Sequence, residues 1–280
     1  MLLIEACEES GSYDLPAYIE HLSDRIDSPS LVVCLDSGAG NYEQLWITTS
    51  LRGVAAGTLS VDILDEGVHS GAASGIVPSS FRIARRLISR LEDETDGRIL
   101  PEDLQASIPA QRREQLAEVA RALGDGVHEA FPWVGGAEPM GSEPLERLLN
   151  RNWRAALSVT GAGGLPAIDS AGSVLRPGTQ LKLSMRLPPT IDGKAGTARV
   201  KEILENDPPY GAKVRFEPDQ SATGWNAPEV ADRLDRSCQD ASWAVFGKPA
   251  MKVCESLGDD PNPRIPGLAR LRRSPSPRFG

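Results

Sequence analysis

The chain begins with two short apolar runs, each followed by acidic and small residues. Residues 2–4 (LLI) lead to residues 8–12 (EESGS), and residues 31–35 (LVVCL) lead to residues 36–38 (DSG). Such runs are typical of buried strands in a parallel sheet, where the carboxyl ends of the strands open into ligand-binding loops. We therefore expect an α/β layer here, and three carboxylates at two strand ends indicate a cation site.

A different pattern begins near Thr58. Residues 59–63 alternate apolar and polar side chains as a half-buried strand does, and residues 83–91 repeat apolar side chains at helical spacing. The same two patterns predict the other elements of this region, which are strands at residues 156–159, 181–187 and 214–216 and a helix at residues 200–204. The resulting order is βαββαβ, which predicts a ferredoxin-like sheet with its helices on one face.

A helical insertion separates the first helix of this pattern from its second strand, at residues 96–153. Apolar residues at 116–123 predict an amphipathic helix. A loop rich in glycine and proline around Gly135 and Gly136 then precedes a shorter helix at residues 145–149. We expect the insertion to belong to the same domain as the ferredoxin-like sheet.

These patterns predict a smaller α+β domain inserted into the α/β domain. The α/β domain is expected to comprise residues 1–51, with a short helix at residues 15–22, and residues 219–257, where it resumes near Trp225. The inserted domain comprises residues 52–218. A chain of 280 residues is long enough for two such domains.

Composition narrows the range of partners. A net charge of -9 argues against nucleic acid and anionic membranes, because an acidic surface is repelled by both. The four cysteines form no CxxC pair, and three lie in or beside apolar runs, which indicates reduced, buried thiols in a cytoplasmic protein. No apolar stretch approaches the roughly 20 residues that span a bilayer, and the amino terminus is unlike a signal peptide. Small molecules and other proteins remain as partners.

The chain carries an ordered set of short motifs, which are residues 5–12 (EACEESGS), 34–36 (CLD), 51–53 (LRG), 68–71 (VHSG), 96–100 (DGRIL), 184–188 (SMRLP) and 246–249 (FGKP). In order and spacing this set resembles the M20 family of metallopeptidases, and most of all its carnosinase and cytosolic dipeptidase branch. The resemblance covers roughly residues 2–251. It implies a partial catalytic α/β domain with an inserted lid that mediates homodimerisation, and a zinc-dependent hydrolase of short peptides or related amides, with two zinc ions in each complete active site.

The resemblance assigns roles to three carboxylates. Adjacent Glu8 and Glu9 at a strand end project to opposite sides, so they can take different roles. By similarity Glu8 is the general base that accepts a proton from a zinc-activated water, and Glu9 and Asp36 are zinc ligands. Without the other motifs, the Glu-Glu pair would be read as a solvated acidic loop and Asp36 as a turn residue. Residues 36–40 also resemble a phosphate-binding loop, but they lack the lysine and the spacing of a P-loop.

Two further residues are assigned to substrate. By similarity His69 reaches the active site of the partner subunit and stabilises the oxyanion there, although an isolated histidine is more often a plain surface residue. Arg186 shares the polar face of its strand with Lys182 and Ser184, where a guanidinium can hold a substrate carboxylate or simply face solvent. Residues 161–164 (GAGG) are expected to form a turn, because no helix start follows them.

The resemblance leaves the metal site incomplete. The family uses a histidine and a bridging aspartate from an amino-terminal segment, the counterparts of Glu9 and Asp36, and a histidine near the carboxyl end. Three of these five ligands have no counterpart here, since the sequence starts at the Glu-Glu strand and no histidine follows His128. We therefore expect the isolated chain to be inactive as a hydrolase. His21 and His128 are expected at surface or helix-end positions. One alternative is a non-catalytic dimerisation module, which explains the absent ligands. Another is an amidase that acts on N-acyl or carbamoyl amino acids, because it shares the metal chemistry and differs only in its pocket.

The last residues differ in character from the acidic body. Residues 261–280 contain five arginines and no acidic residue, and we expect residues 258–280 to be a disordered, out-of-frame tail. Removing one base from a reverse translation of residues 258–263 restores Gly-Thr-Ile-Pro, which the family carries after the motif at residues 246–249.

Sequencing the coding DNA tests this expectation. The alternative reading frame should continue the family pattern and encode a histidine downstream of residue 258. An alternative frame without such a histidine would show that the insertion hypothesis is wrong. An upstream frame with a His-x-Asp motif would show that the gene is split.

Overall fold

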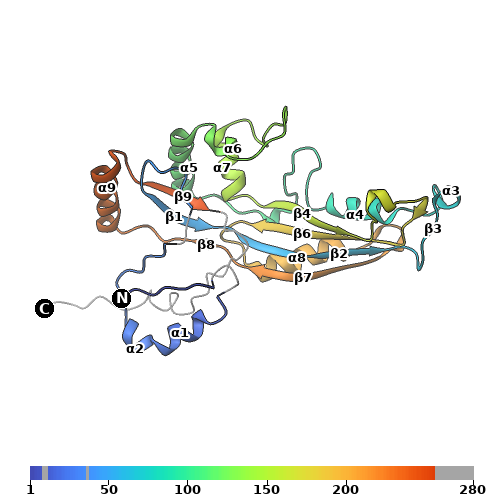
Figure 1. Ribbon diagram of the computed structural model, residues 1–280, viewed down its shortest axis with the longest axis horizontal. Helices are drawn as coiled ribbons and strands as arrows, with labels where there is room; N and C mark the ends of the chain where they lie inside the picture. Colours follow the sequence, from blue (N-terminus) through green and yellow to red (C-terminus); the bar gives the residue numbers. More distant parts are fainter. Residues whose placement is uncertain (8–11, 36–37, 256–280) are drawn as a thin grey trace. The chain divides into compact units, whose positions relative to one another are not determined.

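The computed structural model describes residues 1–7, 12–35 and 38–255 (Figure 1). The described residues divide into two units, the first up to Gly38 and the second from Ala39 onward. Among the described residues, none of the helices has the length and the apolar character that a membrane-spanning helix needs.

The first unit contains two short helices, α1 (Leu15–His21) and α2 (Ser23–Ile26). Helix α1 confirms the helix predicted at residues 15–22.

The two strands predicted in this unit, at residues 2–4 and 31–35, are wrong. Both runs are irregular and exposed, with Ile4 83% and Leu35 91% accessible. Neither run pairs with a strand in the part of the chain that the structure describes, and without a neighbour a run cannot satisfy its backbone groups or cover its side chains as a parallel sheet does. Cys7 and Cys34 are accordingly exposed, so the prediction of buried thiols is wrong for these two residues.

The second unit contains the predicted ferredoxin-like sheet. Its elements follow the order βαββαβ and are β2 (Gly53–Asp62), α4 (Ser80–Ile88), β4 (Ala156–Gly163), β6 (Gly178–Leu187), α8 (Gly193–Glu205) and β7 (Lys213–Ala222). The strands lie in the order β4-β6-β2-β7, and every neighbouring pair is antiparallel. This order confirms the fold class predicted from the hydrophobic pattern.

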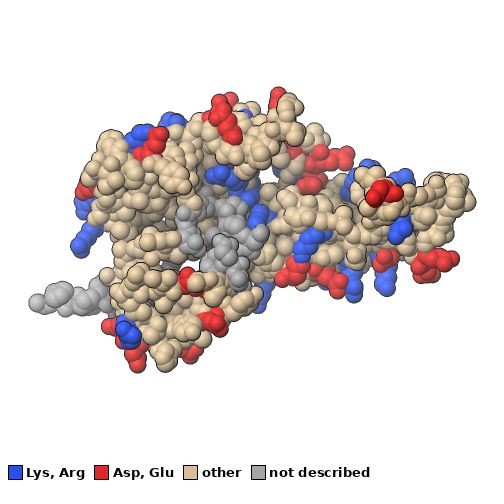
Figure 2. Space-filling view, in the orientation of Figure 1, with Lys and Arg blue, Asp and Glu red and all other residues tan. Residues whose placement is uncertain are grey.

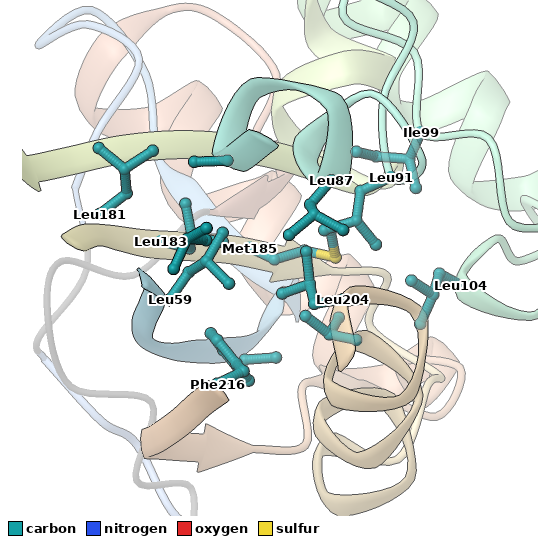
Figure 3. Packing of buried hydrophobic residues seen from close by; sticks show 14 of the residues in the cluster. Leu59, Leu87, Leu91, Ile99, Leu104, Leu181, Leu183, Met185, Leu204 and Phe216 are labelled. Atoms are coloured by element: carbon teal, nitrogen blue, oxygen red, sulfur yellow. The ribbon is translucent and has the colours of Figure 1, made fainter. Parts of the chain in front are cut away.

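The hydrophobic core lies between one face of this four-stranded sheet and helices α4 and α8. Alternate side chains of β6 point into it, as the period of a strand requires, and Leu183 is 1% exposed. Figure 3 shows Leu59 of β2 and Phe216 of β7 in the same core, opposite Leu87 of α4 and Leu204 of α8. Burial of each large side chain contributes roughly 1.5–3 kcal/mol, so this one face accounts for much of the stability of the sheet.

A separate three-stranded sheet has the order β8-β1-β9. Strand β1 (Trp46–Leu51) is parallel to β9 (Met251–Glu255) and antiparallel to β8 (Trp225–Asn226), and α9 (Asp232–Phe246) connects β8 to β9. The shorter elements of the unit are β3 (Val68–His69), α3 (Ser70–Ala73), β5 (Val174–Leu175) and the 3-10 turns Glu102–Leu104, Ile168–Ser170 and Pro209–Gly211.

The helical insertion has a core of its own. Helices α5 (Ala110–Leu123), α6 (Gly126–Glu129) and α7 (Pro144–Asn152) pack around the fully buried Trp153, with Trp46 of β1 at the edge of this cluster. Helices α5 and α7 match the two predicted at residues 116–123 and 145–149.

Two buried arginines join the insertion to the three-stranded sheet. Arg52 lies between β1 and β2 and donates to the carbonyl oxygens of Asn150 and Arg154, each at 3.4 Å. Arg112 of α5 donates to Asn226 Oδ1 at 3.0 Å and to the carbonyl of Ala227 at 2.6 Å. Because buried guanidinium groups need acceptors, these contacts fix where the insertion sits.

The N-cap of α8 gives a pH-dependent test of the fold. Asp192 accepts from the N–H of Ala195 at 2.9 Å, and this hydrogen bond lowers the pKa of the carboxyl. Replacing it (Asp192→Ala) should lower the melting temperature at pH 7. Since the folded-state pKa is depressed, the stabilising effect is present above the ordinary pKa of about 3.9 and is lost as pH falls through the lower value. Differential scanning fluorimetry from pH 2 to 7 should show that the difference in melting temperature between wild type and Asp192→Ala becomes smaller at acid pH.

Asp192→Asn is the matched control, because asparagine is an equally good N-cap that does not titrate. A gap between Asp192→Ala and wild type that did not change with pH would contradict the assignment of the cap to the ionised carboxylate.

Candidate functional site

Three of the predicted site residues lie outside the described residues. They are Glu8, Glu9 and Asp36, so the base and the two zinc ligands remain predictions, as does the tail at residues 258–280. Among the residues that the structure does describe, no group of three or more His, Cys, Asp and Glu side chains could hold a metal ion.

His69 lies in a small ribbon beyond the end of β2. Strand β3 pairs antiparallel with β5, so that Val68 is opposite Leu175 and His69 is opposite Val174. The N–H of Ser70 donates to the carbonyl of Ser173 at 2.9 Å and holds the next residue to the same connection. The imidazole is exposed, as a side chain that reaches a partner subunit needs to be.

The His69 side chain is the N-cap of α3. Its Nδ1 accepts a hydrogen bond from the N–H of Gly71 at 3.1 Å. Hydrogen bonds therefore hold residues 68–71 and the imidazole in a defined conformation, so this segment is not an open loop.

Arg186 is half-buried on the face of β6 that points away from the core. In the neighbouring strands it is opposite Val54 and Ala156. The predicted polar face with Lys182 and Ser184 is confirmed, since the residues between them are buried. Lys182 forms an ion pair with Asp219 of β7.

One chain does not bring His69 and Arg186 together. Arg186 is in register with Val54 at the start of β2, whereas His69 follows the end of β2 at Asp62. At about 3.3 Å per residue, these two positions are roughly 25 Å apart along the sheet. Figure 1 shows β3 and α3 at the end of this unit opposite β1 and β9.

The other two histidines lie in short helices, and Glu43 and Glu92 are among the carboxyl groups whose pKa is shifted. His21 ends α1 and is exposed, and His128 in α6 is bound through Nδ1 to Arg147 at 3.0 Å, as expected for helix-end residues. A hydrogen bond from Lys248 lowers the pKa of Glu43, and burial raises the pKa of Glu92.

One groove among the described residues lies between α5, α9 and β9. It has a volume of about 550 Å³ and is lined by Glu118 and Arg121 of α5, Gln239 of α9 and Met251 of β9. Pro249, in the motif at residues 246–249, also lines this groove, but His69 and Arg186 do not, and the groove is wide open.

The two edges of the four-stranded sheet differ sharply. Strand β7 carries alternating charges, including the pair Arg215–Glu217 at 3.1 Å, and its pairing with β2 shifts register at Pro218. Figure 2 shows charged side chains of both signs along the side of the sheet where β7 lies in Figure 1. Strand β4 (ALSVTGAG) has no charged residue, and its Val159 is 50% exposed. Proteins normally protect a free edge with charges or proline, so β4 has the character of an edge that pairs with another strand.

Sequence reasoning missed this edge. The absence of charge in residues 156–163, beside four charged residues in residues 213–222, was readable from the chain. Only the strand order shows that both segments lie at edges.

Comparison with known proteins matches this chain to peptidases. Residues 49–212 match the model of the M20 peptidase dimerisation domain. A cysteinylglycine-S-conjugate dipeptidase of Corynebacterium striatum is 27% identical over 236 residues, which are 82% of this chain and 48% of that protein. A beta-Ala-His dipeptidase of Mus musculus is 26% identical over 209 residues, which are 72% of this chain and 41% of that protein. The chain thus spans somewhat less than half the length of the curated relatives it matches.

Solved structures share the fold. A di-peptidase of Saccharomyces cerevisiae superposes with a TM-score of 0.66 at 20% identity, covering 92% of this chain and 54% of the other. Human carnosine dipeptidase 1 gives a TM-score of 0.63 at 19% identity, covering 94% of this chain and 54% of the other.

Proposed function

Because this chain belongs to the M20 peptidase family through its dimerisation domain, we propose that it forms a homodimer that serves the hydrolysis of short peptides. The observation that carries the proposal is the separation of His69 from Arg186 along the sheet. Neither residue can act on the same small substrate as the other within one chain, whereas two copies can combine them.

The uncharged edge supplies the pairing. If β4 of one copy pairs antiparallel with β4 of a second copy, the two sheets join with their directions reversed. The end that carries the partner's His69 then lies beside the end that carries Arg186. The pairing also covers Val159 and satisfies the outward backbone groups of β4.

A charge placed on this edge tests the dimer. Val159→Lys should convert a dimer into a monomer, because a lysine would meet its own copy close to the two-fold axis and burying it would cost several kcal/mol. Sedimentation velocity measures the change. Val245→Lys is the control, since Val245 is 72% exposed on α9 and away from the edge. A Val159→Lys variant that remained dimeric would rule out β4 as the interface.

The proposed chemistry uses the two described residues in different ways. Arg186 can bind the carboxylate of a short peptide through two parallel N–H donors. The imidazole of the partner's His69 can donate to the carbonyl oxygen of the same peptide and stabilise the negative charge that develops there. Both contacts suit a substrate that is short enough to have a carboxylate near its scissile bond.

The residues proposed to bind zinc all lie outside the described part of the chain. When bound, it would lower the pKa of a water molecule and polarise the peptide carbonyl. Glu9 and Asp36 are the proposed ligands, and Glu8 is the proposed base. The described residues do not fit a zinc site, because no three potential ligands among them come together. The second candidate function is a dimerisation module without catalysis, which is supported by the match of residues 49–212 to the dimerisation domain.

Incubating the purified chain with Zn²⁺ and measuring zinc binding and dipeptide cleavage distinguishes the two candidate functions. The hydrolase proposal expects bound zinc by mass spectrometry and release of amino acids from Cys-Gly or β-Ala-His. Arg186→Ala should raise KM roughly 10- to 100-fold, as expected for loss of a charge-assisted contact. His69→Asn should lower kcat about 100-fold.

Asparagine at position 69 preserves an N-cap acceptor for α3, so that loss of activity in this variant is not loss of structure. A dimer that neither binds zinc nor cleaves dipeptides would contradict the hydrolase proposal and assign the chain to the module.

A further inference from the structure

We propose that Gly71 is a positioning residue that fixes the tautomer of His69, so that the imidazole presents Nε2–H as a neutral hydrogen-bond donor. The use of this donor in a peptide site rests on the proposed function. The tautomer itself rests only on the contacts of residues 68–71.

The hydrogen bond determines where the ring proton resides. A backbone N–H can only donate, so Nδ1 of His69 must carry the lone pair that accepts from Gly71 at 3.1 Å. In a neutral imidazole the single proton is then on Nε2. Protonating Nδ1 would direct two N–H groups at each other and break this bond.

The space beside the imidazole also favours glycine at position 71. A Cβ atom on residue 71 would lie 3.0 Å from Cε1 and 3.1 Å from Nδ1 of His69, closer than most real contacts. Its φ angle is outside the left-handed region, so the backbone conformation alone would accept other residues. The absence of a side chain therefore serves the approach of the imidazole.

The remaining contacts hold the backbone around His69 in place and leave Nε2 available. Residue 69 is held by its pairing with Val174, and the N–H of Ser70 by the carbonyl of Ser173. The imidazole is exposed, so its second nitrogen is accessible to another molecule. An N–H donor without a positive charge is suited to a carbonyl oxygen, because it binds the acceptor without forming a fixed ion pair in the ground state.

Nitrogen-15 NMR of the full chain tests the tautomer directly. The protein contains only three histidines, so labelling with ¹⁵N-histidine gives a spectrum that His69→Gln can assign. In the neutral imidazole of His69 we expect an unprotonated Nδ1 and a protonated Nε2. His128 should show the same form, because its Nδ1 accepts from Arg147. His21, exposed at the end of α1, is the reference for an unconstrained mixture.

Two variants test the role of Gly71. Gly71→Pro removes the N–H, and the His69 signals should move to the positions seen for His21, with His128 unchanged. Gly71→Ala keeps the N–H but crowds the ring, and it should produce a smaller move in the same direction. Circular dichroism shows whether each variant is folded. If the proline variant does not fold, the alanine variant alone tests the role of Gly71.

A protonated Nδ1 in the wild-type protein would overturn the inference, and so would a folded Gly71→Pro variant with unchanged His69 signals. These outcomes are independent of catalysis. Absence of dipeptide hydrolysis with the expected tautomer would count against the proposed function alone, whereas hydrolysis with the opposite tautomer would count against this inference alone.

Discussion

The pairing of β2 with both of its neighbours is the constraint on which the second unit depends. Strand β2 is hydrogen-bonded to β6 and to β7 over nearly all of its ten residues, and its Leu59 and Val61 are completely buried. One end of the strand continues from the three-stranded sheet, and the other leads to the ribbon that carries His69. A central strand of this kind cannot bend without breaking two ladders, so the spacing between its ends is fixed.

Buried cations hold the three-stranded sheet to the helical insertion. The guanidinium of Arg52 lies at the carboxyl end of α7, where unpaired carbonyls and the helix dipole both favour positive charge. Arg112 performs a similar task at β8, where its acceptors are an amide side chain and a backbone carbonyl. Removing an acceptor from such a group leaves a buried charge without compensation, which is strongly destabilising.

Local periodicity predicted the elements whose cores are formed by neighbours within the chain. The alternation at residues 181–187 gave both the strand and its buried face, because one face of β6 packs on helices from the same unit. Residues 2–4 and 31–35 have an equally apolar pattern, yet they form no strand. The difference is nonlocal, since a buried parallel strand needs partners that its own sequence does not specify.

The candidate site was predictable to a similar extent. Motifs identified His69 and Arg186, and the strand pattern placed Arg186 on the polar face. The separation of roughly 25 Å along β2 depends on strand register, and the hydrogen bond from Gly71 depends on a helix of four residues, so the sequence predicted neither of them.

The contrast between the two sheet edges has a consequence for assembly as a whole. A sheet that could pair with another copy at both of its edges would allow copies to add without end and form a filament. Here β7 is closed to further addition by Pro218, by the extra residue at its register shift and by its row of ionised side chains. With one uncharged edge in the described four-stranded sheet, the pairing proposed for β4 would be self-limiting, because β7 offers no second edge of the same kind.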